Sequence, residues 1–204
     1  MKKICILFFS LLVAISLCAQ NQSFAKLDRQ YQVSLVPQPT GVSCWATSIA
    51  MLLWWRDGNN VDPTQVADDL AYWVQFFNED VGGLQKDDRF PFQYYGMKVE
   101  DPLCYTVEGM YNLLDDYGPL WVALDVCYPD DTCAHALVVT GMFGDGTPDG
   151  TILYINDPDD GSGSYPNSGE QYNLTYSAFA VKLEELGAND LSDSAPQDYY
   201  IAHF

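Results

Sequence analysis

Residues 44–58, "CWATSIAMLLWWRDG", form a strongly apolar segment in the first half of the chain. Its apolar positions point to most faces of a helix, which is typical of a helix buried on all sides. Ser43 stands where an N-cap is expected, and Gly58 stands where a helix commonly ends. The pattern therefore predicts a buried helix that begins at or next to Cys44.

Two further helices are predicted in the first half of the chain. Residues 61–78, "VDPTQVADDLAYWVQFFN", have Asp62 as a candidate cap and Pro63 in the first turn. Residues 106–118, "TVEGMYNLLDDYG", begin at a candidate cap, Thr106, and end at a glycine followed by proline.

Beyond residue 118 the pattern changes to short runs rich in β-branched and aromatic residues, separated by Gly, Pro and Asp. These runs predict strands at residues 120–126, 135–143, 151–157 and 198–204, with a late helix at 175–187, while residues 20–34 are polar and expected to be extended. Helices followed by strands predict an α+β fold, with an N-terminal helical lobe packed on a C-terminal antiparallel β-sheet lobe.

The N-terminal segment has the pattern of a targeting signal. Lys2 and Lys3 precede an apolar run, and "LCAQ" offers small residues for cleavage. We expect a signal peptide at residues 1–19, one mature domain at 20–204, and export to the periplasm or the medium. The alternative is a lipoprotein anchored at Cys18, but Leu17 is bulkier than such sites usually accept.

The charge of the chain narrows the classes of partner. The whole chain has 9 Lys and Arg against 28 Asp and Glu. Residues 1–19 contain two of the lysines and no acid, so the mature chain would have a formal charge of −21. Such a surface repels nucleic acid and anionic membranes. It could favour basic substrates, although solubility outside the cell is the simpler and preferred explanation. With no second long apolar run, we expect no membrane span, and we expect a monomer.

Four cysteines remain after cleavage: Cys44, Cys104, Cys127 and Cys133. Export would place them in an oxidising compartment. Cys127 and Cys133 flank the turn-rich sequence "YPDDT" and form the natural disulfide pair, although pairings with Cys104 stay open. Two histidines and scattered cysteines have no zinc-like spacing, so we expect no metal and no cofactor.

Cys44 fits the requirements of a nucleophile. A thiol reacts as its thiolate, which the partial positive charge at a helix N-terminus favours. A histidine must take part in the proton transfers, and the chain has only His135 and His203. His135 opens the apolar strand 135–143, so the strand could hold it rigidly at the edge of a cleft.

The histidine also needs a partner on its second ring nitrogen. A hairpin through "GDGTPDG" would bring the end of the strand 151–157 beside His135, where Asn156 and Asp157 are both suitable. Neighbours on a strand point to opposite faces, so only one of them can serve. Gln38, six residues before Cys44, could join the Cys44 backbone N–H in stabilising an oxyanion.

The segment "QPTGVSCWA" resembles the active-site segment of papain-like cysteine proteases, and "HALVVTG" resembles their histidine strand. The order Gln38, Cys44, His135, then Asn156 or Asp157 is also theirs. The expected Asn-Ser-Trp is replaced by "NDP", which is similar to the compact bacterial branch, namely avirulence-effector proteases and bacteriocin-processing peptidase domains. In that branch the Asp of Asp-Pro completes the triad, which implies that Asp157 serves here and that Asn156 is the alternative.

The resemblance implies a secreted cysteine peptidase that acts on a polypeptide substrate. Cys44 would attack the carbonyl carbon, His135 would protonate the departing amine, and Gln38 would stabilise the oxyanion. The same triad could serve a cell-wall peptide amidase or a transglutaminase-like acyl transferase, because the cleft chooses the acceptor. A non-catalytic exported binding module is the third reading, but a binding protein has no need for all four residues.

Overall fold

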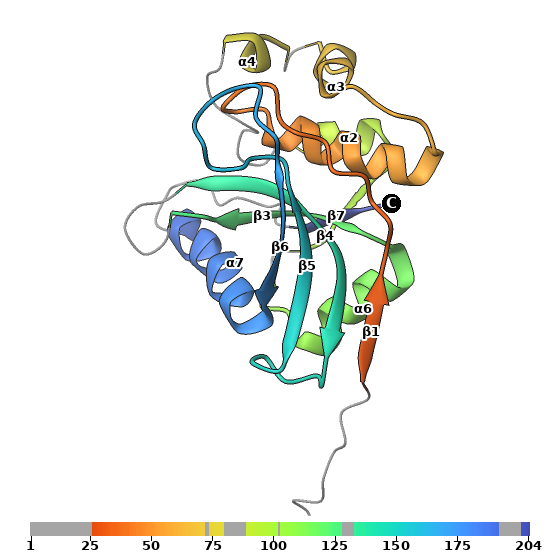
Figure 1. Cartoon of the computed structure of the whole chain (residues 1–204), viewed down its shortest axis with the longest axis vertical. Helices are drawn as coiled ribbons and strands as arrows, with labels where there is room; N and C mark the ends of the chain where they lie inside the picture. The colour runs from red at the N-terminus through yellow and green to blue at the C-terminus, as the bar shows by residue number, and fades with distance from the viewer. Residues whose placement is uncertain (1–25, 72–73, 80–88, 102, 128–132, 192–200) are drawn as a thin grey trace, which may run out of the picture.

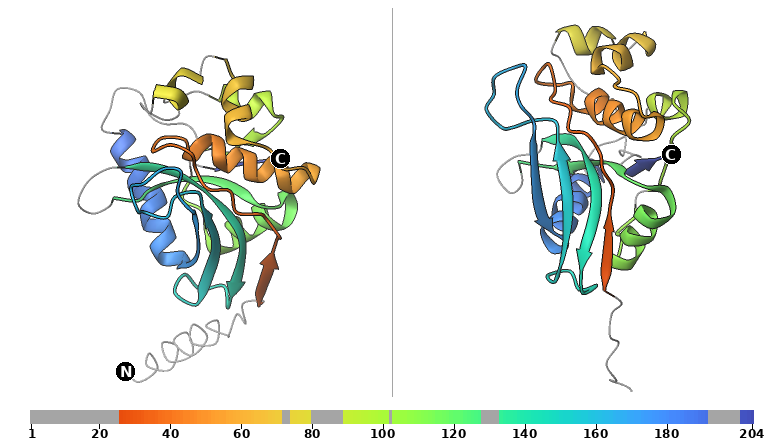
Figure 2. Two further views of the ribbon diagram at one scale, coloured as in Figure 1. Left: turned by 45° about the horizontal axis from the view of Figure 1, so that its top comes forward. Right: turned by 45° about the vertical axis from the view of Figure 1, so that its right-hand side comes forward.

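The computed structural model describes residues 26–71, 74–79, 89–101, 103–127, 133–191 and 201–204. Helices α2, α3 and α4 lie together at one end, and a sheet with α6 and α7 forms the other (Figure 1). Figure 2 shows the same two-part arrangement from two further directions. The predicted α+β class, with a helical lobe packed on an antiparallel sheet lobe, is confirmed. The predicted signal peptide, residues 1–19, lies outside the described residues.

Six helices are assigned among the described residues: α2 at Cys44–Asp57, α3 at Pro63–Asp69, α4 at Val74–Glu79, α5 at Phe90–Tyr94, α6 at Val107–Tyr117 and α7 at Tyr176–Leu191. The predicted caps of α3 and α6 are confirmed. Asp62 accepts a bond from the Thr64 N–H at 2.8 Å, and Thr106 accepts one from the Gly109 N–H at 3.0 Å.

The strands are β1 at Leu27–Gln30, β2 at Lys98–Val99, β3 at Leu120–Asp125, β4 at Ala134–Gly144, β5 at Thr151–Asp157, β6 at Glu170–Thr175 and β7 at Ile201–His203. They form one antiparallel sheet in the order β2-β7-β3-β4-β5-β6, and β1 pairs with β4. The four strands predicted from the second half of the chain are present as β3, β4, β5 and β7. Strand β6 was not predicted, because only two apolar residues, Tyr172 and Leu174, alternate with polar residues in this short run.

Helix α2 is the core of the helical lobe. Every residue from Trp45 to Leu53 is buried, and the helix packs on β3 and β4. Gly58 ends the helix with φ at +71°, the left-handed conformation that glycine adopts at low cost. Ser43 occupies the N-cap position, but its hydroxyl donates to the Thr40 carbonyl and does not cap the helix. The cap predicted for the Ser43 side chain is therefore absent.

The prediction of a single helix over residues 61–78 is wrong, because two helices, α3 and α4, occupy this stretch. Leu70 leaves the helical conformation, and the Leu70 and Ala71 N–H groups bond to carbonyls three residues back. Such tight bonds are typical of the last turn of a helix. Leu70 is nevertheless buried, so the chain bends to keep this apolar side chain in the core.

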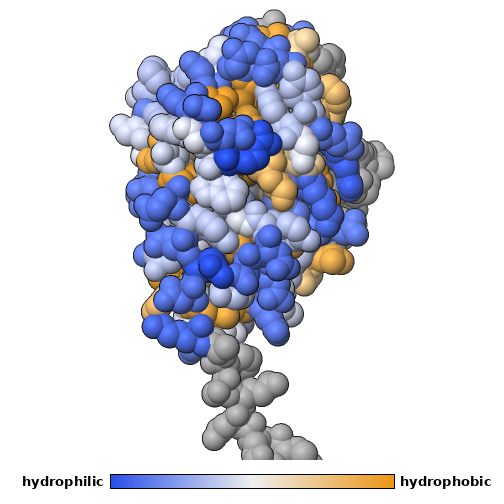
Figure 3. Space-filling model, turned by 90° about the vertical axis from the view of Figure 1, so that its right-hand side faces the viewer, coloured by the Kyte–Doolittle hydropathy of each residue, from blue (hydrophilic) through white to orange (hydrophobic). Residues whose placement is uncertain are grey.

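The core contains residues of both lobes. The largest fully buried side chains include Trp45 from α2, Trp121 from β3 and Phe92 from α5. The Trp121 indole N–H donates to the Trp45 carbonyl, and the Trp121 ring meets that of Phe92 edge-on. The face in Figure 3 is mostly hydrophilic, with only scattered hydrophobic residues. None of the helices described here is long and apolar enough to cross a membrane.

Candidate active site

Cys44 is the first residue of α2, and its side chain is partly exposed at the front of this buried helix. Its thiol is free. Trp45 and Ala46, directly behind it, belong to the core, so the helix holds Cys44 in a fixed place. The unpaired N–H groups of a first turn favour an anion at this position. The fold therefore presents the thiol at the N-terminus of a rigid, buried helix.

His135 and Asp157 meet at the ends of two neighbouring strands. His135 is the second residue of β4, and Asp157 is the last residue of β5. The antiparallel pairing of β4 with β5 brings these ends together. The His135 Nε2 atom lies 2.6 Å from Asp157 Oδ1, and both side chains are nearly buried, at 13% and 12% exposure. This leaves the Nδ1 atom of the ring for the thiol of Cys44.

The environment of His135 stabilises its protonated form. Burial alone would lower its pKa, but hydrogen bonds to Asp157 and Cys44 and the negative charges of both raise the pKa to about 10. The imidazolium is thus retained across neutral pH. His135 therefore holds a proton beside the Cys44 thiol, as a histidine that assists a cysteine nucleophile must.

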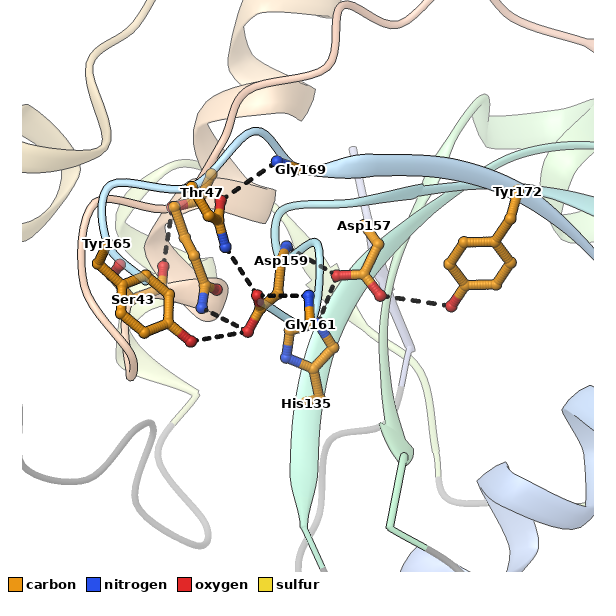
Figure 4. Close-up of polar contacts among 11 residues, drawn as sticks. Ser43, Thr47, His135, Asp157, Asp159, Gly161, Tyr165, Gly169 and Tyr172 are labelled. Carbon is orange, nitrogen blue, oxygen red and sulfur yellow. Dashed lines mark hydrogen bonds and ion pairs between the residues drawn. The ribbon is translucent and has the colours of Figure 1, made fainter. Parts of the chain in front are cut away.

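Two further groups hold the Asp157 carboxylate. The Asp159 N–H donates to Oδ1 at 2.9 Å, and the Tyr172 hydroxyl donates to Oδ2 at 3.3 Å. Figure 4 shows Asp157 between His135 and Tyr172. Burial raises the pKa of Tyr172, and the charge of Asp157 raises it further, so the hydroxyl keeps the proton that it donates. With both oxygens bonded, the carboxylate is held in place beside His135.

Asn156 lies on the opposite face of β5. Its amide donates to the Val33 carbonyl at 2.9 Å, and its side-chain oxygen accepts from Gln171 at 2.7 Å. It is buried, with both ends of the amide occupied. Of the two residues that the sequence left open, the structure brings Asp157 to His135 and directs Asn156 elsewhere.

Gln38 is fully buried in the segment that leads to α2. Its backbone N–H donates to the Pro158 carbonyl at 2.8 Å, and its side-chain Nε2 donates to Asp159 Oδ2 at 3.1 Å. The predicted glutamine is therefore joined to the turn that follows Asp157. Sequence reasoning missed Asp159 and Tyr172, since no spacing rule marks the first and the second lies on the unpredicted strand β6.

A disulfide joins Cys127 to Cys133, as the sequence predicted, and Cys104 is free and exposed. The buried carboxylate of Asp125 accepts bonds from the N–H groups of both bridged cysteines, at 3.2 and 3.1 Å. Cys133 lies two residues before His135. The disulfide and Asp125 together fix the point at which the chain enters β4.

A cleft of about 350 Å³ adjoins His135 and Asp157. Its wall combines apolar side chains with acidic ones. The lining residues are Leu124, Val126, His135, Asp157, Asp159, Asp160, Gly161, Glu170, Tyr172, Leu174 and Lys182. It has room for a side chain of a polymeric ligand next to the imidazole. Among the described residues no group of three or more His, Cys, Asp and Glu side chains is arranged to hold a metal ion.

Comparison with known proteins yields one family. The family model described as papain-like cysteine protease AvrRpt2 matches residues 23–176. Among solved structures, digestive procathepsin L 3 from the larval midgut of Tenebrio molitor is similar, with 12% identity and a TM-score of 0.45. That match covers 91% of this chain and 71% of the other. No curated protein matches this chain.

Proposed function

Because the chain belongs to the family of papain-like cysteine proteases typified by AvrRpt2, we propose that it is an exported peptidase that hydrolyses peptide bonds through Cys44, His135 and Asp157. The family makes the protein a cysteine peptidase with a polypeptide substrate. The assignment of individual residues, the mechanism and the export form the proposal.

The observation that carries the proposal is the short contact between His135 Nε2 and Asp157 Oδ1, at 2.6 Å, with Cys44 interacting with the same ring. A nucleophile, a base next to it and a group that orients the base are what nucleophilic catalysis requires. The three residues lie on α2, β4 and β5, so rigid elements support all of them.

The reaction follows from these positions. The Cys44 thiolate forms a bond with the carbonyl carbon, and the negative charge moves to the carbonyl oxygen. The Cys44 N–H and the Gln38 amide donate to that oxyanion. His135 gives its proton to the departing amine as the C–N bond breaks. Water then attacks the thioester, His135 takes a proton from the water, and the acid is released with the thiolate restored.

Two observations support export. Residues 1–19 have the composition of a signal peptide, and the chain contains a disulfide between Cys127 and Cys133. Structural disulfides persist mainly in oxidising compartments. A periplasmic or secreted location explains both features.

Covalent labelling tests the proposal. The protein is treated with an epoxide inhibitor directed at cysteine nucleophiles, and the labelled residue is found by mass spectrometry. We expect labelling at Cys44 that is lost in His135→Ala, with Cys104 as the internal control because it is a free, exposed thiol without a histidine partner. A folded protein in which Cys44 reacts no faster than Cys104 would contradict the proposed nucleophile.

The products then identify the reaction. Incubation with a peptide library should yield new amino and carboxyl termini, and both should be absent with Cys44→Ala. Cleavage of cell-wall peptides but not of the peptide library would replace the proposed function with that of a cell-wall peptide amidase. Transfer of the acyl group to an added amine in preference to water would replace it with that of an acyl transferase.

A further inference from the structure

The turn after β5 connects two parts of the proposed machinery. Asp157 accepts from His135, the Pro158 carbonyl accepts from the Gln38 backbone N–H, and Asp159 accepts from the Gln38 side chain. Three consecutive residues therefore contact the base and the proposed oxyanion donor. The role of Asp157 is part of the triad, but nothing in the triad accounts for the carboxylate of Asp159.

The Asp159 carboxylate accepts four hydrogen bonds. Its Oδ2 atom accepts from Gln38 Nε2 at 3.1 Å and from the Tyr165 hydroxyl at 2.9 Å. Its Oδ1 atom accepts from the Gly161 N–H at 3.0 Å and from Asn167 Nδ2 at 2.7 Å. Two carboxylate oxygens offer about four acceptor positions, so the group is saturated. Figure 4 shows Asp159 next to two of these donors, the Tyr165 hydroxyl and the Gly161 N–H.

The bond from Gln38 determines which way its amide points. A glutamine amide has an oxygen at one end and a nitrogen at the other, and rotation by half a turn exchanges them. In the exchanged orientation, Gln38 Oε1 would face an oxygen of Asp159, and two acceptors would oppose each other. An ionised carboxylate only accepts, so it selects the orientation with Nε2 toward Asp159.

No other bond fixes the amide at its second end. Among the residues that the structure describes, Gln38 Oε1 is buried and has no hydrogen-bond partner. The selection between the two orientations therefore depends on Asp159. A buried amide with an unpaired oxygen would otherwise have reason to rotate toward any available donor.

We propose that Asp159 is a positioning residue for the oxyanion hole: its carboxylate fixes the Gln38 amide so that the remaining N–H of Nε2 is available to the oxyanion. The amide nitrogen has two N–H bonds, and Asp159 takes one of them. This inference rests on the proposed function, because Gln38 is a donor only if Cys44 forms a tetrahedral intermediate.

The four donors also limit the electrostatic cost of placing a carboxylate near a developing oxyanion. Hydrogen bonds to an ionised acceptor are roughly twice as strong as those between neutral groups, and they distribute its charge. Asp159 can therefore orient Gln38 without opposing the charge that forms on the substrate. Its effect on catalysis passes entirely through the orientation of the amide.

The competing explanation is that Asp159 only anchors the loop between β5 and β6. Asp160 provides a matched control, since it also accepts bonds from this loop, from the Ser162 and Ser168 N–H groups, each at 2.9 Å, and it has no bond to Gln38. If loop anchoring is what matters, Asp159→Ala and Asp160→Ala should impair the enzyme alike.

A double-mutant cycle tests the proposal. Peptide hydrolysis is measured for the wild type, Asp159→Ala, Gln38→Ala, the double variant and Asp160→Ala. Loss of one oxyanion donor lowers kcat by about 100-fold or more. We expect Asp159→Ala to lower kcat by about tenfold or more with little change in KM, and to have no further effect in the Gln38→Ala background, because residues that act as a unit are not additive. Asp160→Ala should keep the wild-type kcat; because Asp160 also lines the cleft, its KM is not part of the control.

Alkylation of Cys44 by iodoacetamide provides the second readout. Displacement of iodide at a saturated carbon forms no oxyanion, so its rate and pH profile report only the thiolate and His135. We expect both to be unchanged in Asp159→Ala, which also establishes that the variant is folded. Asp159→Asn keeps the volume of the side chain and one of its two acceptor oxygens. It should therefore lower kcat less than Asp159→Ala does.

Each other outcome has a distinct meaning. If Asp159→Ala lowers kcat equally with and without Gln38, or if Asp160→Ala is equally impaired, the positioning role is wrong while the peptidase function stands. If the iodoacetamide profile of Asp159→Ala shifts, the residue acts on the triad and not through Gln38, which also overturns the inference. If the wild type hydrolyses no peptide and its Cys44 is inert to iodoacetamide, the proposed function itself fails.

Discussion

At the scale of single residues, the end of β5 and the turn after it contain three polar side chains, Asn156, Asp157 and Asp159, and each has different partners. Asn156 contacts Val33 and Gln171, Asp157 contacts His135, and Asp159 contacts Gln38. Alternation along β5 separates the first two, because consecutive side chains on a strand point to opposite faces. Asp159 follows the end of the strand, so its direction depends on the turn.

The pH dependence of activity should report the contact between Asp157 and His135. The pKa of His135 is raised to about 10, so the imidazolium is lost as the pH rises through that value, and kcat/KM should fall there. Asp157→Asn removes a charge that raises this pKa, which should move the alkaline limb to lower pH. The profile of kcat/KM against pH is the measurement.

Substitutions of Asp157 and of its neighbour Asn156 should also differ in their effect on kcat/KM. Removing the group that orients a catalytic histidine impairs proton transfers worth 10²–10⁴-fold, so Asp157→Ala should lower kcat/KM by about 100-fold. Asn156→Ala serves as the control and should retain near wild-type kcat/KM in the folded fraction. A larger loss of kcat/KM for Asn156→Ala than for Asp157→Ala would reverse their roles.

At the scale of elements, helices α6 and α2 differ in whether a side chain caps their first turn. The Thr106 side chain caps α6, whereas Ser43, at the start of α2, bonds back to Thr40. The first N–H groups of α2 are thus not occupied by the cap side chain. This suits the proposed role of Cys44, the first residue of α2, as a nucleophile that reacts as an anion.

The cap of α6 gives a stability prediction. Thr106→Ala removes the acceptor of the Gly109 N–H and should lower the free energy of unfolding by about 0.5–2 kcal/mol, measured by urea denaturation. Thr106→Ser keeps the hydroxyl and should restore most of the loss. Equal destabilisation by both substitutions would mean that the methyl group, and not the cap, is what stabilises the helix.

At the scale of the whole molecule, acidic charge dominates. The formal charge of the chain is −19, and acidic side chains line the cleft beside His135. A field of one sign attracts ligands of the other and is screened by salt over about 10 Å at 0.1 M ionic strength. The charge thus bears on which peptides reach the site.

This field predicts a salt dependence. For a peptide substrate with several lysines, kcat/KM should fall as the ionic strength is raised from 10 to about 300 mM, because screening slows association. A matched neutral peptide with the same sequence at the cleavage site should show little change. Equal slopes for the two peptides would limit the role of the charge to solubility.

The sequence alone determined the parts that depend on neighbouring residues. The helix behind Cys44, its end at Gly58, the caps Asp62 and Thr106, and the disulfide between Cys127 and Cys133 all follow from local patterns. The spaced motifs also indicated the class of peptidase, because the residues that resemble its nucleophile, base and orienting group follow one another along the chain in the same order.

Only the tertiary structure decided the contacts between distant segments. Gln38 and Asp159 are 121 residues apart in the sequence, and they meet because the strand ending at Asp157 passes beside the segment that leads into α2. The choice of Asp157 over Asn156 depended likewise on which face of β5 is turned toward β4's first residues. Such contacts arise from the packing of the two lobes, which no local pattern contains.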